Sequence, residues 1–367
     1  MLIEKLARKS ALTITPYQPG KPIEEVAREL GMPEEDIVKM ASNENPLGAS
    51  PMGIQAIKDA AEKVGLYPDG GCYYLKQDLA KHLDVASENL ILGNGSNEVL
   101  MIIADTFVNP EDETLYAEQS FVVYMLATKV SGATAVTVPL KNYTHDLEAI
   151  ADKITDKTKV IFIANPNNPT GTMVTADEVK RFMDRVPDHV IVVFDEAYYE
   201  YVERDDFPNT VEYVREGRSV VTLRTFSKIY GLAGLRIGYG ITTPEIVKIL
   251  DKVRQPFNVN AVAQAAAIAS LKDKEHVEKS VKVNSEGKKY LYEKLEEMGL
   301  EYVPSEGNFM LVHLNQSGAD VMAEMLKEGV IVRPMKGYKF PESVRITIGT
   351  KEQNDKLLTA LKKVLGK

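Results

Sequence analysis

A single lysine, Lys228, lies in the stretch TFSKIYGLAGLRIGYG, which runs from residue 225 to residue 240. Two hydroxyl residues, Thr225 and Ser227, precede it, and Arg236 follows eight positions later among small and apolar residues. A neighbouring cation or an apolar environment lowers the pKa of a lysine amine and makes it a better nucleophile. The stretch therefore suggests an amine that forms a Schiff base, although most lysines in loops are simply solvated.

Polar side chains also stand at the ends of other apolar segments. Asp195 ends the segment VIVVFD and is followed at the third position by Tyr198, while Asn168 follows the segment IFIANP. A carboxylate in such a place can bind a metal, cap a helix or pair with a buried cation. Ser96 and Asn97 in LGNGSNEVL stand at the mouth of a predicted helix, whose N–H groups can bind phosphate. The two glycines in LGNGSNEVL do not form the full glycine pattern of a dinucleotide-binding site.

From about residue 90, short β-rich runs alternate with amphipathic helical stretches. The predicted strands are 89–93, 113–118, 133–140, 159–166, 189–197 and 219–227, and the helices between them are 96–107, 120–130, 145–154 and 175–186. Near-continuous valine and isoleucine runs separated by helices predict a mostly parallel sheet covered on both faces. Ligands of such sheets bind beyond the carboxyl ends of the strands. The polar residues described above lie at these ends.

After about residue 245 the pattern changes to long helices followed by short strands. The predicted helices are 244–254, 260–272, 274–298 and 351–365, and the strands are 299–303, 308–314, 329–334 and 343–349. We therefore expect an α/β protein with a large, mostly parallel sheet flanked by helices and a smaller α+β domain. The expected parts are an N-terminal arm with part of the small domain (1–45), a large domain (46–255) and a small C-terminal domain (256–367).

Composition excludes several classes of protein. Hydrophobic residues make up 44% of the 367 residues and charged residues 26%, which is typical of a globular protein in water. A net charge of −9 argues against nucleic acid or an anionic membrane as the main partner. No segment approaches the roughly 20 apolar residues of a transmembrane helix. The single cysteine, Cys72, excludes an intramolecular disulfide and favours a cytoplasmic protein. The five histidines are scattered, so no metal site is expected.

An amine, an acid, amide and hydroxyl donors and a helix mouth together suit pyridoxal 5′-phosphate, which needs each of them. Their order resembles the class-II pyridoxal-phosphate-dependent aminotransferases of fold type I, and within them the histidinol-phosphate aminotransferases. The resemblance covers essentially the whole chain. The stretches that carry it are SNENPLGASP, GLYPDG, NPNNPTG, DEAYYEY, TFSKIYGLAGLRIGYG and VRITIGT.

This resemblance implies a role for each matching residue at the cofactor. Lys228 would hold the cofactor aldehyde and, once the substrate has displaced it, move the proton at the substrate α-carbon. Asp195 would keep the pyridine nitrogen protonated. Tyr198 and Asn168 would donate to the phenolate oxygen of the ring. The residues implied for the phosphate site are Ser96, Asn97, Thr225, Ser227 and Arg236.

Two aromatic residues match family positions around the ring and its phosphate. Phe121 would stack on the cofactor, although it could equally be an ordinary core aromatic of the helix that follows it. Tyr67 matches a tyrosine that the partner subunit supplies to the phosphate. If Tyr67 has this role, each active site spans two chains and the protein is at least a homodimer.

Four residues match the substrate side of the family pattern. Arg345 would meet the anionic end of the substrate, and Arg333 would provide a second contact. In SVRITIG, Arg345 and Thr347 share one face of a predicted strand, opposite the apolar residues between them. Tyr17 would close over the substrate, and Asn45 lies in a neighbouring family stretch.

The substrates implied are small molecules. An amino group would pass from L-histidinol phosphate to 2-oxoglutarate, giving imidazole acetol phosphate and L-glutamate, a step of histidine biosynthesis. Three alternatives stay open: an aromatic amino-acid aminotransferase for phenylalanine or tyrosine, a decarboxylase of a phosphorylated amino acid, and a ligand sensor without catalysis. A sensor would be expected to carry an added basic DNA-reading segment and to tolerate loss of Lys228. The chain has no such segment, and the lysine is present.

Overall fold

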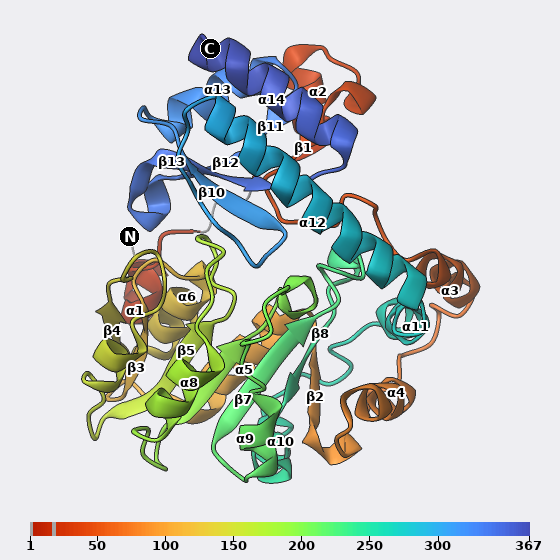
Figure 1. Cartoon of the computed structure of the whole chain (residues 1–367). Coiled ribbons are helices and arrows are strands. Elements are labelled where there is room, and N and C mark those ends of the chain that lie inside the picture. The colour runs from red at the N-terminus through yellow and green to blue at the C-terminus, as the bar shows by residue number, and fades with distance from the viewer. Residues whose placement is uncertain (1–2, 17–19) are drawn as a thin grey trace.

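The structure is a computed structural model and describes residues 3–16 and 20–367. Figure 1 shows a large sheet with its helices in the lower half and a smaller sheet with long helices above it. None of the helices in the described ranges is long and apolar enough to cross a membrane.

The large sheet has seven strands and confirms the predicted α/β class. Its strands, in spatial order, are β2 (Leu90–Gly93), β8 (Gly238–Ile241), β7 (Val220–Thr225), β6 (Ile191–Asp195), β5 (Thr158–Ala164), β3 (Glu113–Ala117) and β4 (Thr134–Val138). The five strands from β7 to β4 pair in parallel, and β8 is antiparallel to both of its neighbours. The sequence pattern predicts the parallel strands but not β8, because two of the four residues of β8 are glycines and leave no strand pattern.

Helices cover both faces of this sheet, as the near-continuous apolar strands require. The helices on one face are α5 (Ser96–Phe107), α6 (Val122–Ser131) and α10 (Pro244–Leu250). Those on the other are α7 (Leu147–Ala151), α8 (Ala176–Met183) and α9 (Val211–Arg215). Alternate residues of β5 point to opposite faces of the sheet. Phe162 packs in the core beneath α5, α6 and α10, and Ile161 and Ile163 pack in the core beneath α7, α8 and α9.

Three further helices pack at the β2 end of the sheet. They are α3 (Pro51–Ala61), α4 (Tyr73–Leu83) and α11 (Ala261–Ser270). Helix α11 lies against α3, and Gly53 allows the close approach because a Cβ there would stand 2.5 Å from the Ser270 hydroxyl. The helix predicted over residues 260–272 is therefore α11.

The smaller sheet is antiparallel, and long helices cover it (Figure 1). Its strands, in spatial order, are β12 (Arg333–Met335), β13 (Phe340–Thr347), β10 (Phe309–His313) and β9 (Tyr302–Val303). The helices are α12 (Lys274–Glu297), α13 (Gly318–Lys327) and α14 (Lys351–Leu365). Strand β1 (Val38–Lys39) pairs in parallel with β11 (Val330–Ile331), and α2 (Ile23–Leu30) packs beside this pair.

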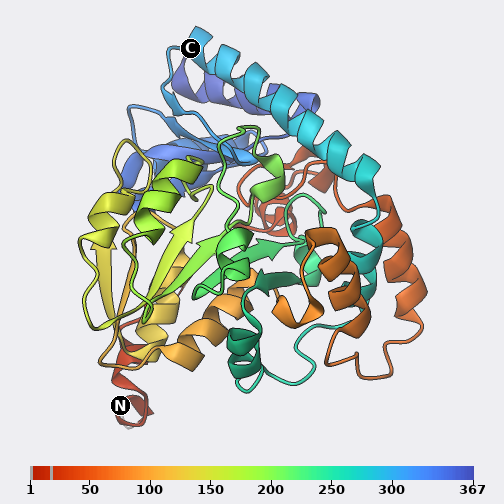
Figure 2. The same ribbon diagram turned by 60° about the horizontal axis from the view of Figure 1, so that its bottom comes forward.

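The start of the chain contacts both halves of the molecule. Helix α1 (Lys9–Leu12) lies against α6, whereas the segment from α2 to β1 joins the smaller sheet. Figure 2 shows the N-terminal end at the opposite end of the molecule from the C-terminus. Single 3₁₀ turns complete the chain: η1 (Ile3–Lys5), η2 (Glu34–Asp36), η3 (Ser87–Asn89), η4 (Tyr199–Tyr201), η5 (Ala233–Leu235) and η6 (Lys336–Tyr338). The domain boundaries at residues 45/46 and 255/256 stay a prediction.

Candidate active site

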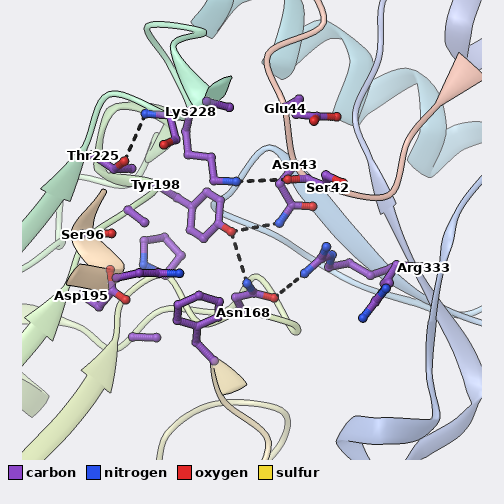
Figure 3. Close-up of a pocket in the computed structure, with 18 of the residues that line it drawn as sticks. Ser42, Asn43, Glu44, Ser96, Asn168, Asp195, Tyr198, Thr225, Lys228 and Arg333 are labelled. Atoms are coloured by element: carbon purple, nitrogen blue, oxygen red, sulfur yellow. Dashed lines mark hydrogen bonds between the residues drawn. The ribbon is translucent and has the colours of Figure 1, made fainter. Parts of the chain in front are cut away.

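One cavity of about 280 Å³ gathers most of the residues that the sequence singles out. It lies between the carboxyl ends of the parallel strands and strands β12 and β13 of the smaller sheet (Figure 3). The predicted site residues that line it are Ser96, Asn97, Phe121, Asn168, Asp195, Tyr198, Thr225, Ser227, Lys228, Arg236, Arg333 and Arg345.

The parallel strands explain why residues far apart in the sequence meet here. Asp195 is the last residue of β6, Thr225 is the last of β7, and Asn168 follows β5. Neighbouring strands run in parallel and in register, with Ala164 of β5 beside Asp195. Their carboxyl ends therefore lie at one edge of the sheet, where the sequence pattern predicts a ligand site.

Asp195 has one satisfied and one unsatisfied carboxylate oxygen. Its side chain is buried, and Tyr124 of α6 donates its hydroxyl to Oδ2 at 2.9 Å. Oδ1 is also buried and has no hydrogen-bond partner within residues 3–16 and 20–367. Burial raises the pKa of Asp195 to about 6. A buried polar atom without a partner is costly, so this oxygen is suited to a ligand that donates a hydrogen bond.

Lys228 extends into the same cavity from the loop after β7. Its Nζ donates to the backbone oxygen of Ser42 at 3.1 Å (Figure 3). Burial lowers the pKa of the amine to about 8, and Arg345 is the strongest electrostatic influence in the same direction. The sequence points to Arg236 as the cation that activates the amine, but its influence is smaller than that of Arg345. This lowered pKa increases the fraction of the amine that is uncharged and nucleophilic near neutral pH.

A chain of hydrogen bonds fixes the hydroxyl of Tyr198. This oxygen accepts from Nδ2 of Asn43 at 2.9 Å and from Nδ2 of Asn168 at 3.3 Å (Figure 3). Oδ1 of Asn168 in turn accepts from Arg345 at 2.6 Å. Burial raises the pKa of Tyr198 to about 12, so the phenol keeps its proton. Because its oxygen already accepts two hydrogen bonds, that proton is available for donation to a ligand.

The start of α5 and Arg236 form a pocket suited to an anion. Ser96 and Asn97 are the first residues of α5, and the residue before them, Gly95, provides no side-chain cap for the helix N–H groups. Two glycines allow close contact. A Cβ at Gly95 would lie 2.5 Å from the Arg236 guanidinium, and one at Gly238 would lie 2.4 Å from the backbone nitrogen of Ser96. Any larger residue would push these groups apart.

Two hydroxyl residues complete this anion pocket. Thr225 accepts a hydrogen bond from the backbone N–H of Ser227 at 3.1 Å, and its hydroxyl donates to the backbone oxygen of Ile237 at 3.3 Å. Both side chains are buried at the cavity wall. Helix N–H groups, hydroxyls and a guanidinium together can bind the three oxygens of a phosphate.

A second cationic group lies on the other side of the cavity. Arg333 of β12 and Arg345 of β13 are direct register partners, so their side chains share one face of the small sheet. Figure 3 shows Arg333 across the pocket from Asp195. Arg345 is held by its contacts with Asn168 and with the backbone oxygen of Ala41, each at 2.6 Å. Val344, on the opposite face of the strand, lies in the apolar core, which confirms the predicted alternation.

Two of the predicted residues do not line this cavity, and a third lies outside the described residues. The Asn45 side chain donates to the backbone oxygen of Ile229 at 2.7 Å and to the Ser280 hydroxyl at 2.9 Å, so it connects structural segments instead. Tyr67 is 83% exposed and stacks on Phe257, with ring centroids 4.8 Å apart. Tyr17 lies outside the residues that the structure describes.

The structure adds residues that the sequence analysis did not name. Ser42, Asn43 and Glu44 line the cavity in place of their neighbour Asn45, and Tyr338 lines its far side. The polar run SNEN was a signal for the first three, because it separates two apolar segments. Tyr124 could have been noticed as a hydroxyl within the apolar stretch FVVYML. No cluster of three or more histidine, cysteine, aspartate or glutamate side chains able to bind a metal occurs among the described residues.

Comparison with known proteins relates this geometry to a family. The family model described as aminotransferase class I and II matches residues 35–361. A histidinol-phosphate aminotransferase from Moorella thermoacetica is 52% identical over 359 residues, which cover 98% of this chain and 92% of the relative. One from Akkermansia muciniphila is 49% identical over 366 residues and all of both chains.

A solved structure agrees with these relatives. The crystal structure of histidinol-phosphate aminotransferase from Sinorhizobium meliloti, in complex with pyridoxal 5′-phosphate, superimposes with a TM-score of 0.88. The superposition covers 98% of this chain and 97% of that one at 27% sequence identity. The chain therefore belongs to the class I and II aminotransferase family, among the histidinol-phosphate aminotransferases.

Proposed function

We propose that this aminotransferase binds pyridoxal 5′-phosphate and carries the amino group of L-histidinol phosphate to 2-oxoglutarate, forming imidazole acetol phosphate and L-glutamate. The observation that carries the proposal is a single cavity lined by both Lys228 and Asp195, whose buried Oδ1 has no partner among the described residues. The names of the relatives and the cofactor of the Sinorhizobium structure support the same assignment.

The residues of the cavity fit this cofactor. Oδ1 of Asp195 lacks a partner, as expected for an atom that pairs with a protonated ring nitrogen. The pocket formed by the start of α5 and Arg236 suits the phosphate, and the glycines at positions 95 and 238 keep it open. Lys228 would hold the aldehyde, and the Tyr198 hydroxyl would donate to the phenolate oxygen.

When bound, the cofactor supplies an aldehyde for amines and an electron-accepting ring. The protein residues then have separate tasks. Asp195, as a carboxylate, stabilises positive charge on the ring nitrogen. Lys228, with its pKa lowered to about 8, would take the proton from the substrate α-carbon and deliver it to the former aldehyde carbon of the cofactor. Burial of the site excludes bulk water from this proton transfer.

The two arginines of the small sheet suit the anionic ends of both substrates. Histidinol phosphate carries a phosphate ester, and 2-oxoglutarate carries a distal carboxylate. The guanidinium groups of Arg333 and Arg345 can bind either anion through paired hydrogen bonds. An enzyme that binds its two substrates in turn needs one site that accepts both.

A half-reaction tests the proposal directly. The purified enzyme with its cofactor is expected to show an absorbance band at the edge of the visible range. Histidinol phosphate alone should bleach this band, and 2-oxoglutarate should then restore it. If phenylalanine bleaches the band while histidinol phosphate leaves it unchanged, the enzyme is an aromatic amino-acid aminotransferase. If histidinol phosphate leaves the band unchanged and a phosphorylated amino acid instead loses carbon dioxide, the enzyme is a decarboxylase and the proposed reaction is wrong.

We also propose that the enzyme is a homodimer whose interface includes Tyr67. Large apolar side chains are exposed around α3 and the start of α4, an unusual density for a protein surface. They are Val64, Leu66, Tyr67, Tyr73, Tyr74 and Phe257. A second copy of the chain would cover them and could place Tyr67 near the neighbouring phosphate pocket.

Sedimentation velocity tests this interface with one pair of variants. The unmodified enzyme is expected to sediment as a dimer of the 40.7 kDa chain. Leu66→Glu places a charge on a side chain that is 77% exposed within the apolar patch, so it should shift the enzyme towards monomer. Leu30→Glu, on α2 of the smaller half and also exposed, is the matched control and should stay dimeric. An unmodified enzyme that sediments as a monomer would exclude the interface.

A further inference from the structure

Tyr124 occupies a place that the mechanism above does not use. It lies in α6, is completely buried, and donates its hydroxyl to Oδ2 of Asp195 at 2.9 Å. Phe121, the residue before α6, lines the cavity, and Tyr124 follows three positions later on the same side of the helix. The tyrosine therefore supports the reacting residues from behind without lining the cavity itself.

Packing fixes the position of the Tyr124 ring. It stacks on Phe162 of β5, with centroids 5.0 Å apart and planes within 1° of parallel. Phe121 meets its edge at 5.8 Å, and Tyr116 lies at 6.2 Å. A ring enclosed on these sides cannot turn its hydroxyl elsewhere, and a buried hydroxyl needs a partner. The Asp195 carboxylate is held at one oxygen as a result, which leaves the other oxygen for a ligand.

We propose that Tyr124 is a positioning residue, which orients Asp195 so that Oδ1 meets the ring nitrogen of the cofactor and which favours the charged carboxylate. This inference rests on the proposed cofactor. It adds a residue that touches neither substrate nor cofactor but decides how well the acid behind the ring performs.

The influences on the pKa of Asp195 also support a role for Tyr124. Burial raises the pKa of Asp195 to about 6, and the hydrogen bond from Tyr124 is the strongest influence that lowers it. Glu196 raises the pKa further, and Lys228 lowers it. The neighbouring Tyr198 is a neutral phenol. Loss of the Tyr124 hydroxyl therefore leaves more of the carboxyl protonated, and a neutral carboxyl cannot neutralise a protonated ring nitrogen.

The test compares Tyr124→Phe with Tyr116→Phe. Both variants remove one buried hydroxyl from the same aromatic cluster, but only Tyr124 contacts Asp195. Tyr124→Phe is expected to weaken equilibrium binding of pyridoxal phosphate about tenfold near neutral pH, as loss of a hydrogen bond to a charged group should. Cofactor affinity should fall as the pH is lowered, because Asp195 becomes protonated. In Tyr124→Phe this fall should begin at a higher pH than in the unmodified enzyme. Tyr116→Phe should bind the cofactor like the unmodified enzyme.

A double-mutant cycle shows whether Tyr124→Phe weakens cofactor binding through Asp195 or through a general disturbance of the fold. In an Asp195→Asn background the acid is absent, so adding Tyr124→Phe should change cofactor affinity little. If Tyr124→Phe weakens binding equally in both backgrounds, or resembles Tyr116→Phe in affinity and pH dependence, the inference is wrong. Failure of the unmodified enzyme to bind pyridoxal phosphate would instead refute the proposed function. Thermal unfolding of the cofactor-free variants shows whether each one is folded.

Discussion

Replacing Lys228 with alanine is expected to slow the half-reaction with histidinol phosphate by about 10³-fold or more, because the variant loses the group that we propose moves the proton at the α-carbon. The effect should fall on the rate constant of proton transfer, since the proposed phosphate pocket and the two arginines proposed to bind substrate stay in place. Stopped-flow absorbance with the cofactor-loaded variant measures this rate. Added small amines should restore part of it, because they supply a base of similar strength.

Lys288 provides a matched control for this experiment. It is a second largely buried lysine, and its Nζ also donates to a backbone oxygen, that of Ser305, at 3.2 Å. Lys288 does not line the cavity and instead pairs with Glu203 at 3.1 Å. Lys288→Ala should therefore lower the free energy of unfolding while leaving the half-reaction rate of the loaded enzyme nearly unchanged. A Lys228→Ala enzyme that keeps more than a few per cent of its rate would contradict the proposed role.

The sequence predicts the parallel half of the site well, for a physical reason. Lys228, Asp195 and Asn168 each follow an apolar strand, and parallel strands bring their carboxyl ends to one edge. Local patterns are therefore enough to place these residues together. The short antiparallel strand β8 lacks such a pattern, yet it pairs with both β2 and β7 and sets where Arg236 enters the site.

Contacts between distant segments could not be predicted in this way. Asn43 binds the Tyr198 hydroxyl, and Arg345 donates to the backbone of Ala41, a residue 304 positions away. Nothing in either segment encodes the other, since the pairing depends on how the two sheets meet. The same limit explains Asn45, which the family resemblance placed on the substrate side but whose side chain donates to Ser280 of α12.

Long-range packing also decides the pKa values of Lys228 and Asp195. The sequence suggested that Arg236 activates Lys228 because the two are close along the chain. In the folded protein, burial and Arg345 have the larger influence on the amine. Burial has the largest influence on the pKa of Asp195, and the hydrogen bond that lowers it comes from Tyr124, 71 positions earlier in the chain. Residue types are thus readable from sequence, whereas their proton affinities depend on the assembled cavity.

Replacing Asp195 with asparagine is expected to slow the half-reaction by about 10²–10³-fold, because the charge that stabilises the protonated ring is lost. Asparagine has nearly the same shape, and its side-chain oxygen can still accept the Tyr124 hydroxyl. The loss should therefore appear in the rate and in cofactor affinity without gross unfolding. Stopped-flow absorbance and cofactor titration measure the two effects. Asp195→Glu should recover little activity, because the longer side chain moves the carboxylate away from its fixed position.

The same variant is expected to be more stable than the unmodified protein when both lack cofactor. The folded pKa of Asp195, about 6, lies above its ordinary value of 3.8, so the unfolded chain releases this proton first as pH rises. The unmodified protein therefore loses stability between about pH 4 and pH 6, by on the order of 2–3 kcal/mol, and the loss persists above that range. Asparagine does not titrate, so the variant avoids this loss. Urea unfolding of both cofactor-free proteins should show that the variant's free energy of unfolding exceeds that of the unmodified protein by an amount that grows across this pH range. If the difference in free energy of unfolding between the two proteins does not depend on pH, Asp195 ionises in the cofactor-free protein at no cost in stability. Its unpaired oxygen would then not favour cofactor binding.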